Sequence, residues 1–285
     1  MPDLWSDLLA CLELRRCPSV GATERHAVPP ADADAVQEFE GPNLPLDYHR
    51  LFGGQILGQL VRAAGLSCPD KAVKSVHAIF GKEGRYEEPV RYEVTCHHEG
   101  RSFATLSVIA RQSTVVVASA SVSMHGAEDG PLHQTIADVP PLLPPDHEVQ
   151  FDLLPWETRS VTDLDDTTAG EPEYEFWMRT PEVSRELASV LTAYATDLNL
   201  IGTALRPVEG VSQQGNGTDF VSAVTSHTLW FHRPFRTTDW LLLRQHSPVL
   251  AHGRCFGRGD VFTKDGTLVA SYAQEALLRF KQDAA

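Results

Sequence analysis

Residues 51–66 read LFGGQILGQLVRAAGL. Apolar side chains of this stretch recur at the spacing of one face of an α-helix, at Ile56, Leu57, Leu60, Val61 and Ala64. Small residues among them would let such a helix lie close to a sheet. Four segments rich in β-branched and aromatic residues follow and are predicted strands, at 74–80, 90–99, 101–111 and 114–125. The stretch therefore predicts a helix packed on an antiparallel meander.

The same order of elements recurs later in the chain. Residues 182–205 carry apolar side chains three or four residues apart and predict a long helix. Four further strand-like segments follow it, at 220–232, 239–249, 252–263 and 267–280. Residues 126–155 contain six prolines, which cannot sustain a helix or a central strand, so this segment is predicted to be an extended linker.

Short matches in the same order indicate that the two halves are repeats. The matched pairs are GRSF at 100–103 with GRCF at 253–256, VAS at 117–119 with VAS at 269–271, and VHAIF at 76–80 with SHTLW at 226–230. We therefore expect an α+β protein in which each half is a helix covering an antiparallel sheet, because that arrangement buries both apolar faces. The expected organisation is an N-terminal repeat at 1–126, a proline-rich linker at 127–155 and a C-terminal repeat at 156–285.

The composition excludes several classes of protein. The 285 residues include 24 Lys and Arg against 38 Asp and Glu, and the net charge of −14 should repel nucleic acid and anionic membranes. No apolar run predicts a membrane span, and the acidic N-terminus does not resemble a secretory signal. The five cysteines are dispersed, which is typical of reduced thiols, and His227 and His232 are expected in the core or on the sheet rather than as metal ligands. We expect a cytoplasmic protein with no metal, no nucleic-acid partner and no membrane insertion.

Four segments resemble a single family. FGGQILGQ at 52–59 resembles the first central helix of the type II (TesB-type) acyl-CoA thioesterases, and YATDLN at 194–199 resembles their second-helix motif. HTLWFHRPF at 227–235 and DGTLVASYAQE at 265–275 resemble a strand and the closing hairpin of the same family, and these two together are highly specific. The resemblance implies a tandem, or double, hotdog fold with two helices, each wrapped by an antiparallel sheet.

The resemblance implies hydrolysis of fatty acyl-CoA to a free fatty acid and CoA by an activated water, with no metal and no organic cofactor. Asp197 falls on the family's aspartate and Gln274 on its glutamine, which hold that water. A carboxylate can accept a proton from water, and an amide can orient the water. Val122 stands in the first repeat where Gln274 stands in the second, so we expect one active site per chain, in the C-terminal repeat.

The family's third residue, a serine or threonine on the first strand of the second repeat, falls on Val224. Regular alternation along the strand places Val224 and Ser226 on one face and Thr225 on the other. The missing hydroxyl could come from Ser226, or from Thr225 if a one-residue bulge brings it across. A non-catalytic homologue that binds acyl-CoA or acyl groups with a decayed site is the alternative function.

Three more residues are expected to contact the substrate. Backbone N–H groups near Gly53 and Gly54 could stabilise the oxyanion, because glycine permits close backbone approach. CoA is polyanionic while the chain is acidic, so Arg233 is predicted to be a local basic group at the CoA site. The resemblance also implies a homodimer or a higher homo-oligomer. A scaffold protein, which would neither bind nor hydrolyse acyl-CoA, is a third possibility.

Overall fold

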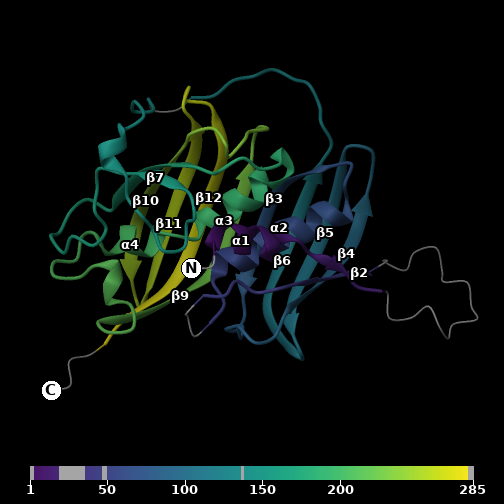
Figure 1. Cartoon of the computed structure of the whole chain (residues 1–285), viewed down its shortest axis with the longest axis horizontal. Coiled ribbons are helices and arrows are strands. Elements are labelled where there is room, and N and C mark those ends of the chain that lie inside the picture. Colours follow the sequence, from purple (N-terminus) through teal and green to yellow (C-terminus); the bar gives the residue numbers. More distant parts are fainter. Residues whose placement is uncertain (1–2, 19–35, 47–49, 136–137, 282–285) are drawn as a thin grey trace, which may run out of the picture. The chain divides into compact units, whose positions relative to one another are not determined.

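The structure is a computed structural model that describes residues 3–18, 36–46, 50–135 and 138–281. The chain divides into two compact units, Met1–Gly130 and Pro131–Ala285. Figure 1 labels the helices and strands of both. No helix within the described ranges is both long and apolar enough to cross a lipid bilayer.

The first unit is a six-stranded antiparallel sheet with a central helix on one face. Its strands lie in the order β1-β2-β4-β5-β6-β3. The helix α2 contacts five of these strands and lies across them in Figure 1. The elements are α1 (Leu4–Leu12), β1 (Arg15–Arg16), β2 (Val36–Gly41), α2 (Gly53–Ser67), β3 (Ala72–Phe80), β4 (Val90–Glu99), β5 (Phe103–Gln112) and β6 (Val115–His125). The predicted helix and all four predicted strands of this half are confirmed, and α2 ends just before Pro69, which disfavours helical backbone at Cys68.

A buried glutamine of α2, Gln59, ties the N-terminal part of the chain to this unit. The Gln59 side-chain amide donates hydrogen bonds to the carbonyl oxygens of Cys11 at 2.7 Å and Pro42 at 2.8 Å. The phenol of Tyr92 donates to the Gln59 carbonyl oxygen at 2.5 Å. Burial raises the pKa of Tyr92 well above its ordinary value, so the phenol keeps its proton and remains a donor. The second glutamine of the FGGQILGQ motif therefore serves the packing of the first unit.

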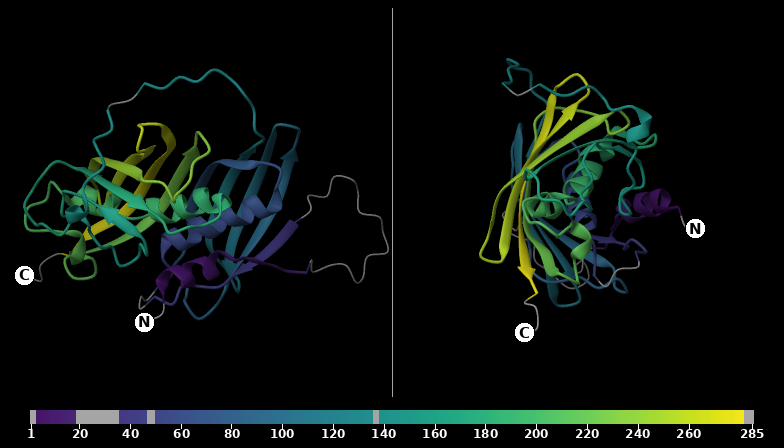
Figure 2. Two further views of the ribbon diagram at one scale, coloured as in Figure 1. Left: turned by 45° about the horizontal axis from the view of Figure 1, so that its top comes forward. Right: turned by 90° about the vertical axis from the view of Figure 1, so that its left-hand side faces the viewer.

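The second unit repeats the plan with the sheet order β9-β12-β11-β10-β8-β7. Figure 2 shows this strongly twisted sheet with its helices on one side. The elements are β7 (Glu157–Arg159), β8 (Glu173–Arg179), α3 (Ala188–Thr196), α4 (Leu200–Leu205), β9 (Phe220–Phe231), β10 (Leu241–Ala251), β11 (Arg254–Thr263) and β12 (Leu268–Phe280). The four predicted strands are confirmed. The prediction of one long helix over 182–205 is wrong, because the helix is interrupted between α3 and α4.

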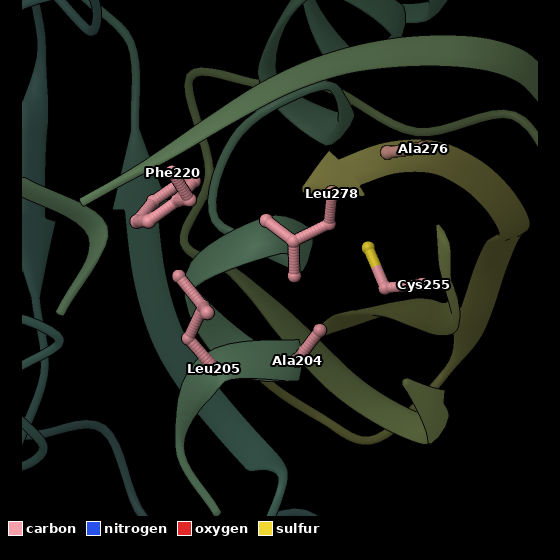
Figure 3. Close-up of a cluster of buried hydrophobic side chains, with 6 residues drawn as sticks. All are labelled: Ala204, Leu205, Phe220, Cys255, Ala276 and Leu278. Carbon is pink, nitrogen blue, oxygen red and sulfur yellow. The ribbon is translucent and has the colours of Figure 1, made fainter. Parts of the chain in front are cut away.

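The inner face of the second sheet builds a core against α4. Ala204 and Leu205 of the helix meet Phe220 of β9 and Leu278 of β12, and Figure 3 shows these side chains converging with Cys255 and Ala276. All six are 5 % exposed or less. Burial raises the pKa of the Cys255 thiol to about 11, so this cysteine is an apolar packing residue.

The linker is attached to the outer face of the second sheet. Val139, Leu142 and Leu143 pack against buried side chains of three neighbouring strands, namely Trp177, Leu242 and Phe262. The backbone from 138 to 144 is neither helical nor part of a strand, as the proline content predicts. The linker therefore covers apolar surface that the helices of the inner face do not reach.

Candidate active site

The predicted catalytic aspartate lies where the long helix is interrupted. Asp197 is the residue that follows α3, and only 8 % of it is exposed. Asn199 takes a left-handed backbone conformation, with φ of 71°, which breaks the helix before α4 begins. The side chain of Gln245 on β10 supports this break: its amide donates to the Leu198 carbonyl oxygen at 3.0 Å, and its oxygen accepts from the Thr203 hydroxyl at 3.1 Å.

Two glycines of β11 make room beside the sheet, one for the interrupted helix and the other for an aromatic ring. A Cβ atom on Gly257 would lie 2.4 Å from Cδ2 of Leu200, the first residue of α4. A Cβ atom on Gly259 would lie 2.4 Å from Cζ of Tyr272 on β12. Gly257 is also paired directly with Gln274 in the sheet. The helix break is thus seated on the part of the sheet that carries the predicted glutamine.

A chain of buried polar side chains connects the end of α3 to Gln274. Gln274 is 2 % exposed, and its side-chain oxygen lies 2.9 Å from Nδ1 of His227 on the neighbouring strand β9. The other ring nitrogen, Nε2, lies 3.1 Å from the hydroxyl of Thr196, the residue before Asp197. The imidazole therefore joins the helix that bears the predicted aspartate to the strand that bears the predicted glutamine.

His227 is neutral at physiological pH. It is fully buried, and this desolvation lowers its pKa from the ordinary 6.5 to about 4, against a smaller opposing effect of its hydrogen bond to Gln274. Its ring stacks on that of Tyr272, with centroids 5.9 Å apart and planes 14° apart. A neutral imidazole has one N–H donor and one acceptor nitrogen, so its two polar neighbours fix which nitrogen carries the proton.

A β-bulge in β9 changes which residues face the helices. His227 pairs with Gln274 and Ser226 with Glu275, but the next pair is Val224 with Ala276, so Thr225 is the extra residue. The expectation that Val224 and Ser226 share a face is therefore wrong. Val224 lies on the face of Gln274, and Ser226 lies on the opposite face with Glu275.

The bulge leaves the Thr225 hydroxyl bonded within the sheet, where it donates to the Glu275 carbonyl oxygen at 3.0 Å. The buried hydroxyl that the structure brings to His227 is instead that of Thr196.

The first repeat has a bulge at the equivalent place but not the polar side chains. In β3 the extra residue is Lys74, and the next inward-facing pair is Val76 with Val122. Measured from the bulge, Val76 corresponds to His227 and Val122 to Gln274. The match of His77 with His227 is therefore one residue out of register, and the two valines are 1 % exposed or less. Only the second repeat carries the histidine–glutamine pair.

The remaining predicted site residues belong to other elements of the chain. Gly53 and Gly54 form the first turn of α2 in the first unit. Arg233 follows β9, where its guanidinium donates to the Gln134 side-chain oxygen at 2.8 Å and to the Leu268 carbonyl oxygen at 2.7 Å. Arg233 thus holds the linker to the second sheet.

Sequence reasoning missed three residues of this site, Thr196, His227 and Gln245. Pairing β9 with β12 as antiparallel neighbours would place His227 near Gln274. The bulge that decides which side chains of β9 point toward the helices has no signature in the sequence. The buried Gln245 could have been suspected from its place between apolar residues of β10.

The two halves of the chain match two parts of one family. Residues 127–278 match the model of the acyl-CoA thioesterase C-terminal domain, and residues 44–125 match that of the acyl-CoA thioesterase N-terminal domain. The chain is 30% identical to acyl-CoA thioesterase 2 of Haemophilus influenzae, covering 86% of this chain and 93% of that protein. It is 31% identical to human acyl-coenzyme A thioesterase 8, covering 88% of this chain and 86% of that protein.

Solved structures agree with these matches. An acyl-CoA thioesterase II from Mycobacterium marinum superimposes with a TM-score of 0.71 at 30% identity, covering 87% of this chain and 94% of that one. The tesB protein of Mycobacterium avium subs paratuberculosis gives 0.74 at 28% identity, covering 96% and 98%. The fold is a double hotdog, in which a helix-covered antiparallel sheet occurs twice in one chain. The chain belongs to the acyl-CoA thioesterase family.

Proposed function

We propose that this protein hydrolyses fatty acyl-CoA to a free fatty acid and CoA, with Asp197 and Gln274 as the groups that act on the water. The observation that carries the site assignment is the Gln274 amide. It is 2 % exposed, and its Nε2 hydrogens have no acceptor among the described residues. A buried amide donor left unpaired costs free energy, and a catalytic role is one of the explanations for such a group. Membership in the acyl-CoA thioesterase family supports the reaction itself.

In the proposed reaction the Asp197 carboxylate accepts a proton from water as the water oxygen attacks the thioester carbonyl carbon. The Gln274 N–H donors orient the water or stabilise the oxygen that gains negative charge. Collapse of the tetrahedral intermediate breaks the carbon–sulfur bond. The proton held by Asp197 then passes to the CoA sulfur, and the products are a carboxylic acid and a thiol.

Release of free thiol from a series of acyl-CoAs of rising chain length tests this function. We expect hydrolysis by the wild type and a loss of about 10²- to 10⁴-fold in kcat for Asp197→Asn. Asp146→Asn is the matched control, because that side chain is 77% exposed on the linker. No release at any chain length would contradict hydrolysis. Equal rates for the wild type and Asp197→Asn would contradict the site.

The alternative of a non-catalytic binder is tested in parallel. Val224 is its supporting observation, since that residue lies on the face of Gln274 and carries no hydroxyl. A binder would take up a thioether analogue of acyl-CoA by calorimetry yet release no thiol from the thioester. We propose that Ser226 and Thr225 are dispensable, because Ser226 pairs with Glu275 and Thr225 bonds to the sheet. Substitution of either by alanine should therefore leave kcat within about threefold.

We also propose which repeat carries the reaction and how the protein assembles. The reaction is assigned to the repeat 156–285, with 1–126 as the non-catalytic repeat and 127–155 as the linker. Gly53 and Gly54 remain candidate oxyanion donors and Arg233 a candidate CoA contact. A homodimer or higher homo-oligomer in the cytoplasm fits the family and the five free cysteines. Light scattering and cell fractionation test these two points.

A further inference from the structure

Gln274 has a single hydrogen-bond partner for its side chain. Among the residues that the structure describes, its oxygen bonds only to His227, and its amide nitrogen bonds to none. The nearby inward-facing position on β9 is Val224, which has no side-chain atom able to form a hydrogen bond. A glutamine amide that lacks a fixed partner can turn its N–H2 and C=O ends around. The orientation of this amide therefore depends on the imidazole.

We propose that His227 is a positioning residue that holds the Gln274 amide with its oxygen toward the ring and its N–H2 group toward the reacting atoms. The proposal rests on the hydrolytic function given above. His227 does not contact the substrate in this scheme and gains no proton during the reaction. It acts through Gln274, and Thr196 acts on it in turn.

The ring position that carries the hydrogen follows from the two contacts. A carbonyl oxygen accepts but cannot donate, so Nδ1 must carry the hydrogen to bond Gln274 at 2.9 Å. Nε2 is then an acceptor, and it shares the single hydrogen of the Thr196 hydroxyl, 3.1 Å away, with the Ala193 carbonyl oxygen, to which that hydroxyl also donates. The Ala193 oxygen lies 3.1 Å from the hydroxyl, within the same helix. Stacking on Tyr272 restricts rotation of the ring, so the bond to Gln274 keeps its direction.

Two substitutions of His227 distinguish the contributions of its two ring nitrogens. Asparagine places an amide group where Nδ1 stands, whereas glutamine places one near Nε2. If His227 acts by holding Gln274, His227→Asn should lower kcat less than His227→Gln does, because it keeps a donor toward Gln274 although it loses the contact with Thr196. His227→Gln should lower kcat about 10- to 100-fold, with KM changed less than about threefold. The reverse order, or an equal loss in both variants, overturns the proposal.

A double-mutant cycle tests whether the effect passes through Gln274. In a Gln274→Ala background, His227→Gln should cause no further loss of kcat, because the group that it positions is gone. If the kcat losses of the two single variants multiply in the double variant, the proposal is overturned. If His227→Gln does not fold, Thr196→Val replaces it: removal of the hydroxyl should lower kcat, while Thr196→Ser should restore it. Equal activity of the Val and Ser variants overturns the proposal.

Nitrogen-15 NMR of the imidazole gives a reading that does not depend on turnover. The wild type should show a neutral ring with the hydrogen on Nδ1 at pH 7. A hydrogen on Nε2 overturns the proposal. Should the wild type release no CoA from any acyl-CoA, the proposed hydrolysis fails. The NMR spectrum and its change in Gln274→Ala still decide whether the imidazole and the amide are coupled.

Discussion

Leu200 lies directly over Gly257, so that a Cβ atom on residue 257 would come within 2.4 Å of the leucine Cδ2. Leu200 begins α4, three residues after Asp197. Gly257 pairs in the sheet with Gln274. The absence of a side chain at one strand position therefore sets the spacing between the helix break and the strand that together form the candidate site.

We predict that Gly257→Ala lowers both stability and activity. The added methyl group must displace Leu200, and overpacking of this kind costs about 1–3 kcal/mol. The displacement should also lower kcat, because it moves the segment that carries Asp197. Denaturant unfolding and thiol release measure the two effects. Gly65→Ala is the control: Gly65 lies in α2 with no heavy atom within 4 Å of its would-be Cβ, so alanine should raise stability by about 0.5–1 kcal/mol. A stable, fully active Gly257→Ala protein would contradict the prediction.

Asn199 should tolerate glycine better than alanine. Its φ of 71° is left-handed, where residues with a Cβ other than Asn and Asp are strained by about 1–2 kcal/mol. Its Nδ2 has no acceptor among the described residues, so loss of that group adds little to the cost. Denaturant unfolding should therefore rank the wild type and Asn199→Gly close together and Asn199→Ala below both. Equal stability of the two variants would show that this backbone geometry is not the constraint.

Acid should destabilise the fold through His227. In the unfolded chain the imidazole takes up a proton below about pH 6.5, but in the folded protein it does so only near the pKa of about 4. The stabilisation is thus fully present above pH 6.5 and is lost as the pH falls toward 4, a difference of about 3 kcal/mol. The side chains that touch the ring, Thr196, Gln274 and Tyr272, stay uncharged over this range. The unfolding free energy measured from pH 4 to 7 should therefore slope less in His227→Asn than in the wild type, and identical slopes would refute this account.

Removal of the Tyr92 hydroxyl should weaken the first unit. Tyr92 is fully buried and donates to Gln59, which holds the backbone at Cys11 and Pro42. We expect Tyr92→Phe to cost about 1 kcal/mol, since the buried Gln59 oxygen loses the shorter of its two hydrogen bonds and keeps the one from the Gln55 amide at 3.3 Å. Tyr86→Phe is the matched control, as Tyr86 is 45 % exposed, and should change stability by less than about 0.5 kcal/mol. Urea unfolding of both variants decides the matter, and equal effects would rule out the buried bond as the cause.

Much of the fold could be predicted from the sequence, because its main signals are local. Apolar spacing revealed α2, β-branched runs revealed the eight long strands, and the prolines indicated the irregular backbone at 138–144. The break at Asn199 could not be predicted, since apolar spacing continues through it while β10 and β11 impose the geometry through Gln245 and Gly257. A bulge at Thr225 was one of the alternatives that the sequence left open. Which side chains of β9 it turns toward the helices depends on the pairing of β9 with β12. Tertiary pairing, rather than local preference, therefore decides which side chains meet at the site.

The two bulges, at Lys74 and Thr225, show that the backbone shape of the candidate site and its polar side chains do not always occur together. The equivalent strands β3 and β9 carry a bulge at the same point. The inward-facing pair beyond the bulge is two valines in the first repeat and a histidine with a glutamine in the second. The bulge is therefore common to both repeats, whereas the polar pair occurs in the second repeat alone. The first repeat thus has the backbone irregularity without the polar side chains, and Val76→His with Val122→Gln would place the same two residue types at the equivalent positions.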